Sequence, residues 1–144
     1  MVTMEELKTP AEMTWCPGCG NFGILTAFKK ALVELGLPRE KVVMVSGIGC
    51  HGKMVNHVNI NGFHGLHGRV IPLASGIKLA NPELTVVGFS GDGDCYEEGW
   101  EHLSHGLRRN LDITVIVHDN MVFGLTTGQT TATSQKGFKS KSTP

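Results

Sequence analysis

Two polar segments follow apolar runs at positions where they could share one ligand. Residues 91–94 read Gly-Asp-Gly-Asp and end the apolar run 86–89, while Asp119 and Asn120 follow the β-branched run 113–117. A hard divalent cation such as Mg²⁺ takes oxygen ligands in near-octahedral geometry, and it is usually held by one or two carboxylates together with substrate phosphates. Glycine lets the backbone approach a phosphate closely. The two segments therefore predict a site for Mg²⁺ and a diphosphate.

The stretch between these segments determines whether they can meet. Residues 95–111 carry apolar side chains at three- and four-residue intervals, with glutamates in the first turns and arginines near the end. This pattern predicts a helix whose charges suit its dipole. The run 113–117 is typical of a strand buried on both faces. Strand, helix and strand make a β-α-β unit, whose strands direct their carboxyl ends to the ligand-binding edge of an open sheet.

The aspartates and the cysteines also allow plainer interpretations. Gly-Asp-Gly-Asp is often only a tight strand-to-helix turn in which the last residue, here Asp94, caps the helix. Cys16 and Cys19 form a Cys-x-x-Cys turn, which without partners is more often a zinc site or a redox pair. Zinc held by Cys16, Cys19, Cys50 and one histidine is therefore an open alternative.

The rest of the chain repeats a β-α pattern, which predicts an α/β fold with a parallel sheet and flanking helices in a single domain over residues 1–144. We expect further helices at 21–35 and 69–79 and further strands at 42–45 and 84–89. Residues 47–68 are rich in glycine and histidine without periodicity, which predicts a long functional loop. A flexible tail is expected at about 126–144.

Composition limits the classes of partner and the compartment. The chain has 13 Lys and Arg against 13 Asp and Glu, a balance that predicts no nucleic-acid partner. No apolar run could span a bilayer and no signal-peptide pattern stands at the N-terminus, so no membrane association is expected. Four cysteines with a Cys-x-x-Cys turn indicate metal rather than disulfides, and a cytoplasmic setting.

Several motifs in order resemble one enzyme family. Gly-Asp-Gly at 91–93 with Asn120 downstream resembles the thiamine-diphosphate motif, which holds Mg²⁺ on the cofactor's diphosphate. Together with it, five other segments resemble the β subunit of 2-oxoacid:ferredoxin oxidoreductases: residues 15–23, 47–53, 65–69, 80–82 and 124–129. The resemblance covers nearly the whole chain from Thr14 onward. It implies an incomplete thiamine-diphosphate-binding fold of the pyrophosphate type, and we expect a C-terminally truncated fragment because the family's β subunit is longer.

The resemblance also implies which residues bind the cofactor and its metal ion. Mg²⁺ would be held by Asp92, the Asn120 side chain and the carbonyl oxygen of Val122. The diphosphate would lie against Gly93, Asp94, Gly124 and Leu125, and the thiamine would lie near Ile48, Gly49, Cys50, His51 and His67. His67 is also an expected catalytic residue, although it could equally be a hydrogen-bonded loop residue.

A further set of residues is implied to serve the substrate and electron transfer. Lys53, the second expected catalytic residue, matches a family lysine that approaches the 2-oxoacid carboxylate, although it could be a simple surface charge, since lysines are mostly exposed. Cys16, Cys19 and Cys50 match ligands of a [4Fe-4S] cluster, which usually takes four thiolates. The family's fourth cysteine lies beyond the end of this sequence.

The implied activity is the oxidative decarboxylation of a 2-oxoacid, either 2-oxoglutarate or pyruvate, with coenzyme A as acyl acceptor and ferredoxin as electron acceptor. The implied partner is an α subunit that contributes the glutamate required by the thiamine, so this chain is expected to be inactive alone. Two alternatives remain: a non-redox thiamine-dependent decarboxylase or synthase module, and a zinc-binding structural domain.

Overall fold

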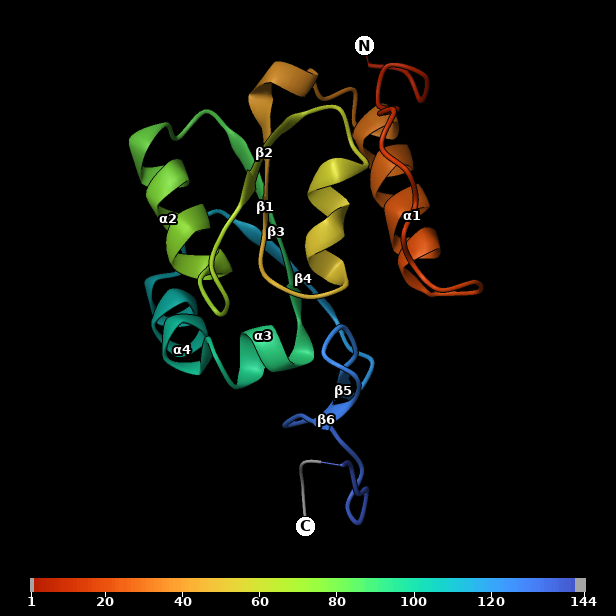
Figure 1. Cartoon of the computed structure of the whole chain (residues 1–144). Helices are drawn as coiled ribbons and strands as arrows, with labels where there is room; N and C mark the ends of the chain where they lie inside the picture. Colours follow the sequence, from red (N-terminus) through yellow and green to blue (C-terminus); the bar gives the residue numbers. More distant parts are fainter. Residues whose placement is uncertain (1, 142–144) are drawn as a thin grey trace.

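The computed structural model describes residues 2–141, which form a parallel sheet with helices on both faces (Figure 1). Its four strands are β1 (Val42–Ser46), β2 (Asn61–His64), β3 (Thr85–Gly91) and β4 (Thr114–His118), in the order β2-β1-β3-β4. Each neighbouring pair is parallel. The predicted α/β fold with a parallel sheet and flanking helices is confirmed.

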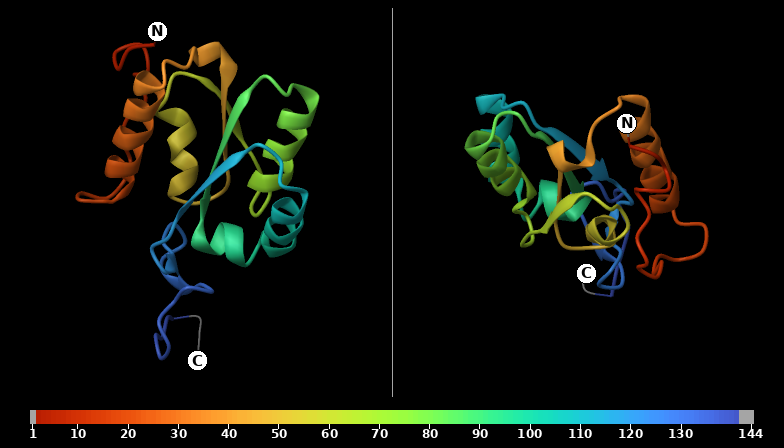
Figure 2. Two further views of the ribbon diagram at one scale, coloured as in Figure 1. Left: turned by 180° about the vertical axis from the view of Figure 1, so that it is seen from behind. Right: turned by 90° about the horizontal axis from the view of Figure 1, so that it is seen from above.

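The helices divide between the two faces of the sheet. Helix α1 (Asn21–Glu34) covers one face, and α2 (Val70–Ala80) and α4 (Trp100–Arg109) cover the other, as the two views of Figure 2 show. Helix α3 (Asp92–Tyr96) follows β3 directly. Two short 3₁₀ helices, η1 (Arg39–Lys41) and η2 (His51–Asn56), flank β1, and a small antiparallel ladder joins β5 (Val122–Phe123) to β6 (Gln129–Thr130). No helix in residues 2–141 is long and apolar enough to cross a membrane.

The hydrophobic core is built on the two central strands. Successive strand side chains point to opposite faces, so Val42 and Met44 of β1 pack with the apolar side of α1, while Val45 packs with Val70 and Ala74 of α2. Strand β3 divides in the same way. Burial on both faces explains why these strands appear in the sequence as continuous apolar runs.

The single helix predicted at 95–111 is wrong, because the structure has two helices, α3 and α4, separated by residues 97–99. At Gly99 the backbone packs against the backbone of Gly68, and a side chain there would come within 2.8 Å of the Gly68 carbonyl oxygen. The chain changes direction at this contact. Helix α4 then packs on α2, while α3 stays at the end of β3.

Three further expectations differ from the structure. The loop predicted at 47–68 contains η2 and strand β2, whose four residues are all exposed and show no apolar alternation. Burial on both faces, expected for the strand at 113–117, is also wrong. This strand corresponds to β4, in which only His118 is buried, since β4 lies at the edge of the sheet and pairs with β3 alone among the described residues. In the segment expected to be a flexible tail, the structure places β6 and turns as far as residue 141.

Candidate functional site

A cavity of about 440 Å³ lies at the carboxyl ends of the central strands. The chain leaves β1 toward β2 on one side, and leaves β3 toward β4 on the other. In open α/β sheets, ligands bind where the connections diverge in this way. The walls come from the turn before α1, the loop after β1, the start of α3 and the loop after β4. Segments far apart in the sequence therefore meet at one site.

Three oxygen atoms converge on the wall of this cavity. The Asn120 amide oxygen lies 2.7 Å from the carbonyl oxygen of Val122 and 3.2 Å from Oδ1 of Asp92. A hydrogen bond to it from the Val122 N–H is long, at 3.4 Å. Oxygens this close repel one another unless the amide is turned over to donate to the other two or a cation lies between them.

The spacing of these oxygens fits a magnesium ion. Adjacent ligands of an octahedral Mg²⁺ at about 2.1 Å lie about 2.9 Å apart, a value between the two distances in the structure. In the absence of the ion, turning the amide would place its NH₂ group between the Val122 and Asp92 oxygens and hold these two oxygens together by hydrogen bonds. The structure thus brings together the three predicted ligands Asp92, Asn120 and Val122, and the donor set suits Mg²⁺.

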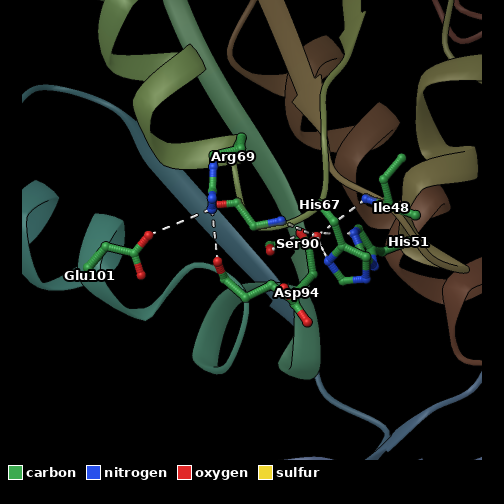
Figure 3. A network of polar contacts seen from close by, with 9 residues as sticks. Ile48, His51, His67, Arg69, Ser90, Asp94 and Glu101 are labelled. Carbon is green, nitrogen blue, oxygen red and sulfur yellow. Dashed lines mark hydrogen bonds and ion pairs between the residues drawn. The ribbon is translucent and has the colours of Figure 1, made fainter.

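Asp94 is the centre of a buried hydrogen-bond network (Figure 3), in which its side chain is 1% exposed. One carboxylate oxygen, Oδ1, accepts from the Gly68 N–H at 2.8 Å and lies 2.8 Å from Nδ1 of His67. The other, Oδ2, accepts from the Ser90 hydroxyl at 2.5 Å and lies 3.3 Å from Nε2 of His51. The carboxylate is therefore surrounded by donors rather than free in the cavity.

The charge state of Asp94 follows from this network. Burial raises the pKa of the Asp94 carboxyl, but hydrogen bonds from His51, the Gly68 N–H and Ser90 outweigh that effect and hold the pKa below its ordinary value. A carboxylate whose oxygens already accept hydrogen bonds gains nothing from contact with a diphosphate, because both groups are negatively charged. Only the backbone of Asp94 is therefore suited to the predicted diphosphate contact.

Two predicted histidines lie on either side of this carboxylate. His67 lines the cavity and turns Nδ1 toward Asp94, which leaves Nε2 as its second polar atom. Its ring also packs edge-on against Phe123, with centroids 6.0 Å apart. His51 is buried, and its ring lies so close to Gly91 that a side chain there would come within 2.7 Å of Nδ1. Glycine at 91 is thus required by His51 as well as by any ligand.

The other predicted cofactor residues all line the cavity as well. A side chain at Gly93 would overlap the Phe123 ring, so its glycine allows the loop after β4 to close on α3. Across the whole prediction, the cavity-lining residues are Cys16, Cys19, Ile48, Gly49, Cys50, His51, His67, Asp92, Gly93, Asp94, Asn120, Val122, Gly124 and Leu125.

The three predicted cluster thiols lie on one wall of the cavity. Cys16 is exposed, and Cys19 and Cys50 are half-buried. Burial raises the pKa of the Cys50 thiol, Lys53 opposes that effect, and Cys19 and Cys16 add to it. Within residues 2–141, no group of three or more His, Cys, Asp or Glu side chains is arranged to hold a metal ion. The thiols are thus near one another but not gathered as a ligand set.

Lys53 is the predicted residue that the structure separates from the others. Its ammonium donates to the carbonyl oxygen of Thr14 at 3.0 Å, and it does not line the cavity. The charge of Lys53 acts on Cys50, where it opposes the burial that raises the pKa of this thiol. The structure offers no contact through which Lys53 would meet a substrate in this cavity.

Two cavity residues are not singled out by the sequence. His118 ends β4, and its Nδ1 lies 2.8 Å from the Oδ1 of Asn21 at the start of α1. Burial, together with the nearby His51, lowers the pKa of His118 to about 4. The two residues lie at opposite ends of the fold in sequence, and no local pattern links them.

Comparison with known proteins identifies the family to which this cavity belongs. Residues 47–144 match the family described as thiamine pyrophosphate enzyme, C-terminal TPP binding domain. The chain belongs to this thiamine pyrophosphate enzyme family. The matched region contains β3, α3 and β4, and thus all three of the converging oxygens.

Among curated proteins, this thiamine pyrophosphate domain is similar to the β subunits that the sequence predicted. It is 51% identical over 137 residues to 2-oxoacid:ferredoxin oxidoreductase 1, subunit beta, of Aeropyrum pernix, which covers 95% of this chain and 43% of that protein. It is 54% identical over 132 residues to 2-oxoacid:ferredoxin oxidoreductase subunit beta of Saccharolobus solfataricus, covering 90% and 43%. The predicted resemblance is confirmed, and the chain spans less than half the length of these relatives.

A solved structure agrees with this relationship. The 2-oxoglutarate:ferredoxin oxidoreductase from Magnetococcus marinus, with 2-oxoglutarate, coenzyme A and succinyl-CoA bound, matches with a TM-score of 0.95 at 40% sequence identity. The match covers 99% of this chain and 49% of that one. The fold of the thiamine pyrophosphate domain is therefore the fold of part of an oxidoreductase subunit.

Proposed function

We propose that this thiamine pyrophosphate domain binds thiamine diphosphate and Mg²⁺ in the cavity between β1 and β3, as part of a 2-oxoacid:ferredoxin oxidoreductase. The observation that carries the proposal is the meeting of the Asp92 carboxylate, the Asn120 amide and the Val122 carbonyl oxygen at this cavity. Phosphate oxygens and water would complete the coordination, as is usual for Mg²⁺ in proteins. Backbone groups at Gly93, Asp94, Gly124 and Leu125 would approach the diphosphate.

The proposed reaction is the coenzyme A-dependent oxidative decarboxylation of a 2-oxoacid, with electrons passed to ferredoxin. Thiamine diphosphate supplies the carbanion chemistry when it is bound, while the protein supplies binding, orientation and electrostatics. His67 and His51, oriented by Asp94, would face the reacting end of the cofactor. The related structure contains 2-oxoglutarate, which favours this acid over pyruvate as the substrate.

Electron transfer would require the three thiols on the cavity wall. We propose Cys16, Cys19 and Cys50 as three ligands of a [4Fe-4S] cluster, because thiolates hold such clusters and these thiols lie beside the cofactor cavity. The fourth ligand and the glutamate that activates the thiamine would come from outside the described residues. An α subunit is the proposed source of the glutamate, so the β chain alone should be inactive.

The ligand assignment is tested by measuring cofactor binding in the complete β subunit assembled with its α subunit. Calorimetry should show Mg²⁺-dependent binding of thiamine diphosphate that Asp92→Ala abolishes. Asp112→Ala, at a surface carboxylate that is 93% exposed, is the matched control and should bind normally. Unchanged affinity in Asp92→Ala would refute the assignment.

The redox part is tested by iron and sulfide analysis of anaerobically purified enzyme. Iron and sulfide that disappear in Cys16→Ser would support the cluster and exclude a non-redox decarboxylase or synthase. Zinc in their place, without any binding of thiamine diphosphate, would favour the zinc-binding structural domain and overturn the proposal.

A further inference from the structure

The segment that follows β6 returns to the aspartate of the proposed metal site. Residues 131–134, Thr-Ala-Thr-Ser, are here called the hydroxyl strap. Thr131 is 6% exposed, and its hydroxyl donates to Oδ2 of Asp92 at 2.6 Å. The Thr133 hydroxyl lies 3.0 Å from the same oxygen. No feature of the sequence marks these residues, which fall in the part of the chain expected to be a flexible tail.

The strap uses one oxygen of Asp92 and leaves the other for the metal position. Oδ2 is the oxygen bound by the two hydroxyls. Oδ1 is the oxygen that lies 3.2 Å from the Asn120 amide. With Oδ2 held, the carboxylate cannot rotate freely about its last bond, so Oδ1 stays directed at the point where the three oxygens converge.

The hydroxyl protons show how the strap joins the two ends of the β-α-β unit. Each hydroxyl has one proton to donate. Thr133 has two carboxylate acceptors, Oδ2 of Asp92 at 3.0 Å and Oδ1 of Asp119 at 2.9 Å. Its hydroxyl therefore sits between the aspartate after β3 and the aspartate after β4. Thr131, whose hydroxyl lies 3.1 Å from that of Thr133, donates its own hydrogen bond to Oδ2 of Asp92 whichever acceptor Thr133 uses.

The strap is itself fixed at its far end. The Ser134 hydroxyl donates to the carbonyl oxygen of Met121 at 2.6 Å and accepts from the Thr131 N–H at 2.8 Å. Met121 lies between Asn120 and Val122 in a left-handed conformation, with φ of 61°. The same short segment thus holds Asp92 and the turn that presents the other two oxygens.

We infer that Thr131 and Thr133 are positioning residues for the divalent cation, fixing Asp92 and the 119–122 turn at the spacing that the ion requires. The inference rests on the proposed function, because it concerns the same metal site. Groups that hydrogen-bond to a metal-ligating carboxylate orient it, and their loss typically lowers metal affinity about 10- to 100-fold. Hydroxyls that only satisfied a buried carboxylate would affect stability without changing cation affinity.

The test measures cation binding directly in the assembled enzyme after removal of metal with EDTA. Mn²⁺ is titrated in the presence of thiamine diphosphate and followed by electron paramagnetic resonance, which reports bound ion independently of turnover. The variant Thr131→Val/Thr133→Val keeps the size and branching of both side chains and removes only the hydroxyls. We expect its Mn²⁺ dissociation constant to rise about 10- to 100-fold.

Two controls make the result specific to the hydroxyls. Thr130→Val makes the same change in β6, next to the strap, and should bind Mn²⁺ like the wild type. Thr131→Ser/Thr133→Ser keeps the hydroxyls, and should stay within about threefold of the wild-type affinity. If the double valine variant fails to fold, Thr133→Val alone removes the half-buried hydroxyl and tests the same effect, and wild-type Mn²⁺ affinity in it would overturn the role of Thr133.

The outcomes separate the inference from the proposed function. Wild-type Mn²⁺ affinity in the valine variant, or loss of affinity in the serine variant equal to that in the valine variant, would overturn the positioning role while leaving the metal site intact. A wild-type enzyme that binds no Mn²⁺ with thiamine diphosphate would instead overturn the proposed function.

Discussion

The substitution Asp94→Asn removes the negative charge from the centre of the buried network while keeping its shape. In the native structure the carboxylate has three short contacts: Ser90 at 2.5 Å, the Gly68 N–H at 2.8 Å and His67 Nδ1 at 2.8 Å. Hydrogen bonds to an ionised acceptor contribute about 1 kcal/mol more than neutral ones. The Ser90 and Gly68 contacts are hydrogen bonds, and two such bonds predict a loss of about 2 kcal/mol in the free energy of unfolding.

The new amide adds a second cost of the same sign. If the amide oxygen of the new side chain takes the place of Oδ1 and keeps the contacts with Gly68 and His67, the amide NH₂ group takes the place of Oδ2. The Ser90 hydroxyl then loses the oxygen that accepts its hydrogen bond in the native structure. A loss of about 2 kcal/mol corresponds to a fall in melting temperature of about 4–8 °C for a domain of this size. Thermal unfolding of the assembled enzyme without added cofactor measures this shift.

The matched control is Asp112→Asn, where the carboxylate is 93% exposed and pairs with Lys78. Removal of an exposed partner should change the free energy of unfolding by less than about 0.5 kcal/mol. If Asp94→Asn and Asp112→Asn have equal melting temperatures, the stabilising role assigned to the Asp94 hydrogen-bond network is refuted. The same variant should still bind thiamine diphosphate, because the Asp94 side chain is 1% exposed and only the backbone of this residue would contact the diphosphate.

Three further changes test other parts of the structure. Phe89 is fully buried and packs on Phe28 with centroids 4.9 Å apart, so Phe89→Ala should cost about 3–5 kcal/mol by urea unfolding, and a cost below 1 kcal/mol would contradict the core assignment. Gly47→Ala would place a methyl group in the Asp94 carboxylate, so we expect its melting temperature to fall, whereas Gly23→Ala in α1, which meets no atom within 4 Å, should not lower it; equal melting temperatures in the two variants would contradict the close contact. The pKa of His118 is lowered from 6.5 to about 4 in the folded protein. As the pH falls, this histidine is therefore protonated in the unfolded state before it is protonated in the folded state, so the free energy of unfolding decreases between about pH 6.5 and about pH 4. Between pH 7.5 and 5 this amounts to about 2 kcal/mol, and the loss should be smaller in His118→Gln; an equal pH dependence in that variant would assign the effect to other groups.

Much of the site could be predicted from local sequence because its chemistry is carried by short motifs. The ends of β3 and β4, at Gly91 and His118, lie side by side in the sheet, as expected for the β-α-β unit predicted from residues 86–117. That pairing alone brings Asp92 near Asn120. The motif resemblance then located all but one of the predicted residues on the cavity wall, with Lys53 the exception.

The errors share a physical origin in contacts between distant segments. The helix expected at 95–111 breaks because Gly99 must pack against Gly68, a constraint that helical periodicity does not contain. Strand β2 has no strand-like pattern, and forms because β1 offers it an unpaired edge. Local propensity is overridden in both places by tertiary packing.

The sequence by itself determined the α/β alternation around the strands β1, β3 and β4, the acidic and amide ends that could hold a cation, and the cysteine and histidine loops beside them. These are properties of short segments, set by side-chain period and by the chemistry of individual residues. Only the tertiary structure decided which polar atoms are engaged by other residues and which are left to bind a ligand. It directed the Asp94 carboxylate to two histidines rather than to the cavity, and it brought Thr131 and Thr133 back onto Asp92. A buried carboxylate must find donors wherever the fold supplies them, and those donors lie too far along the chain for any local pattern to reveal.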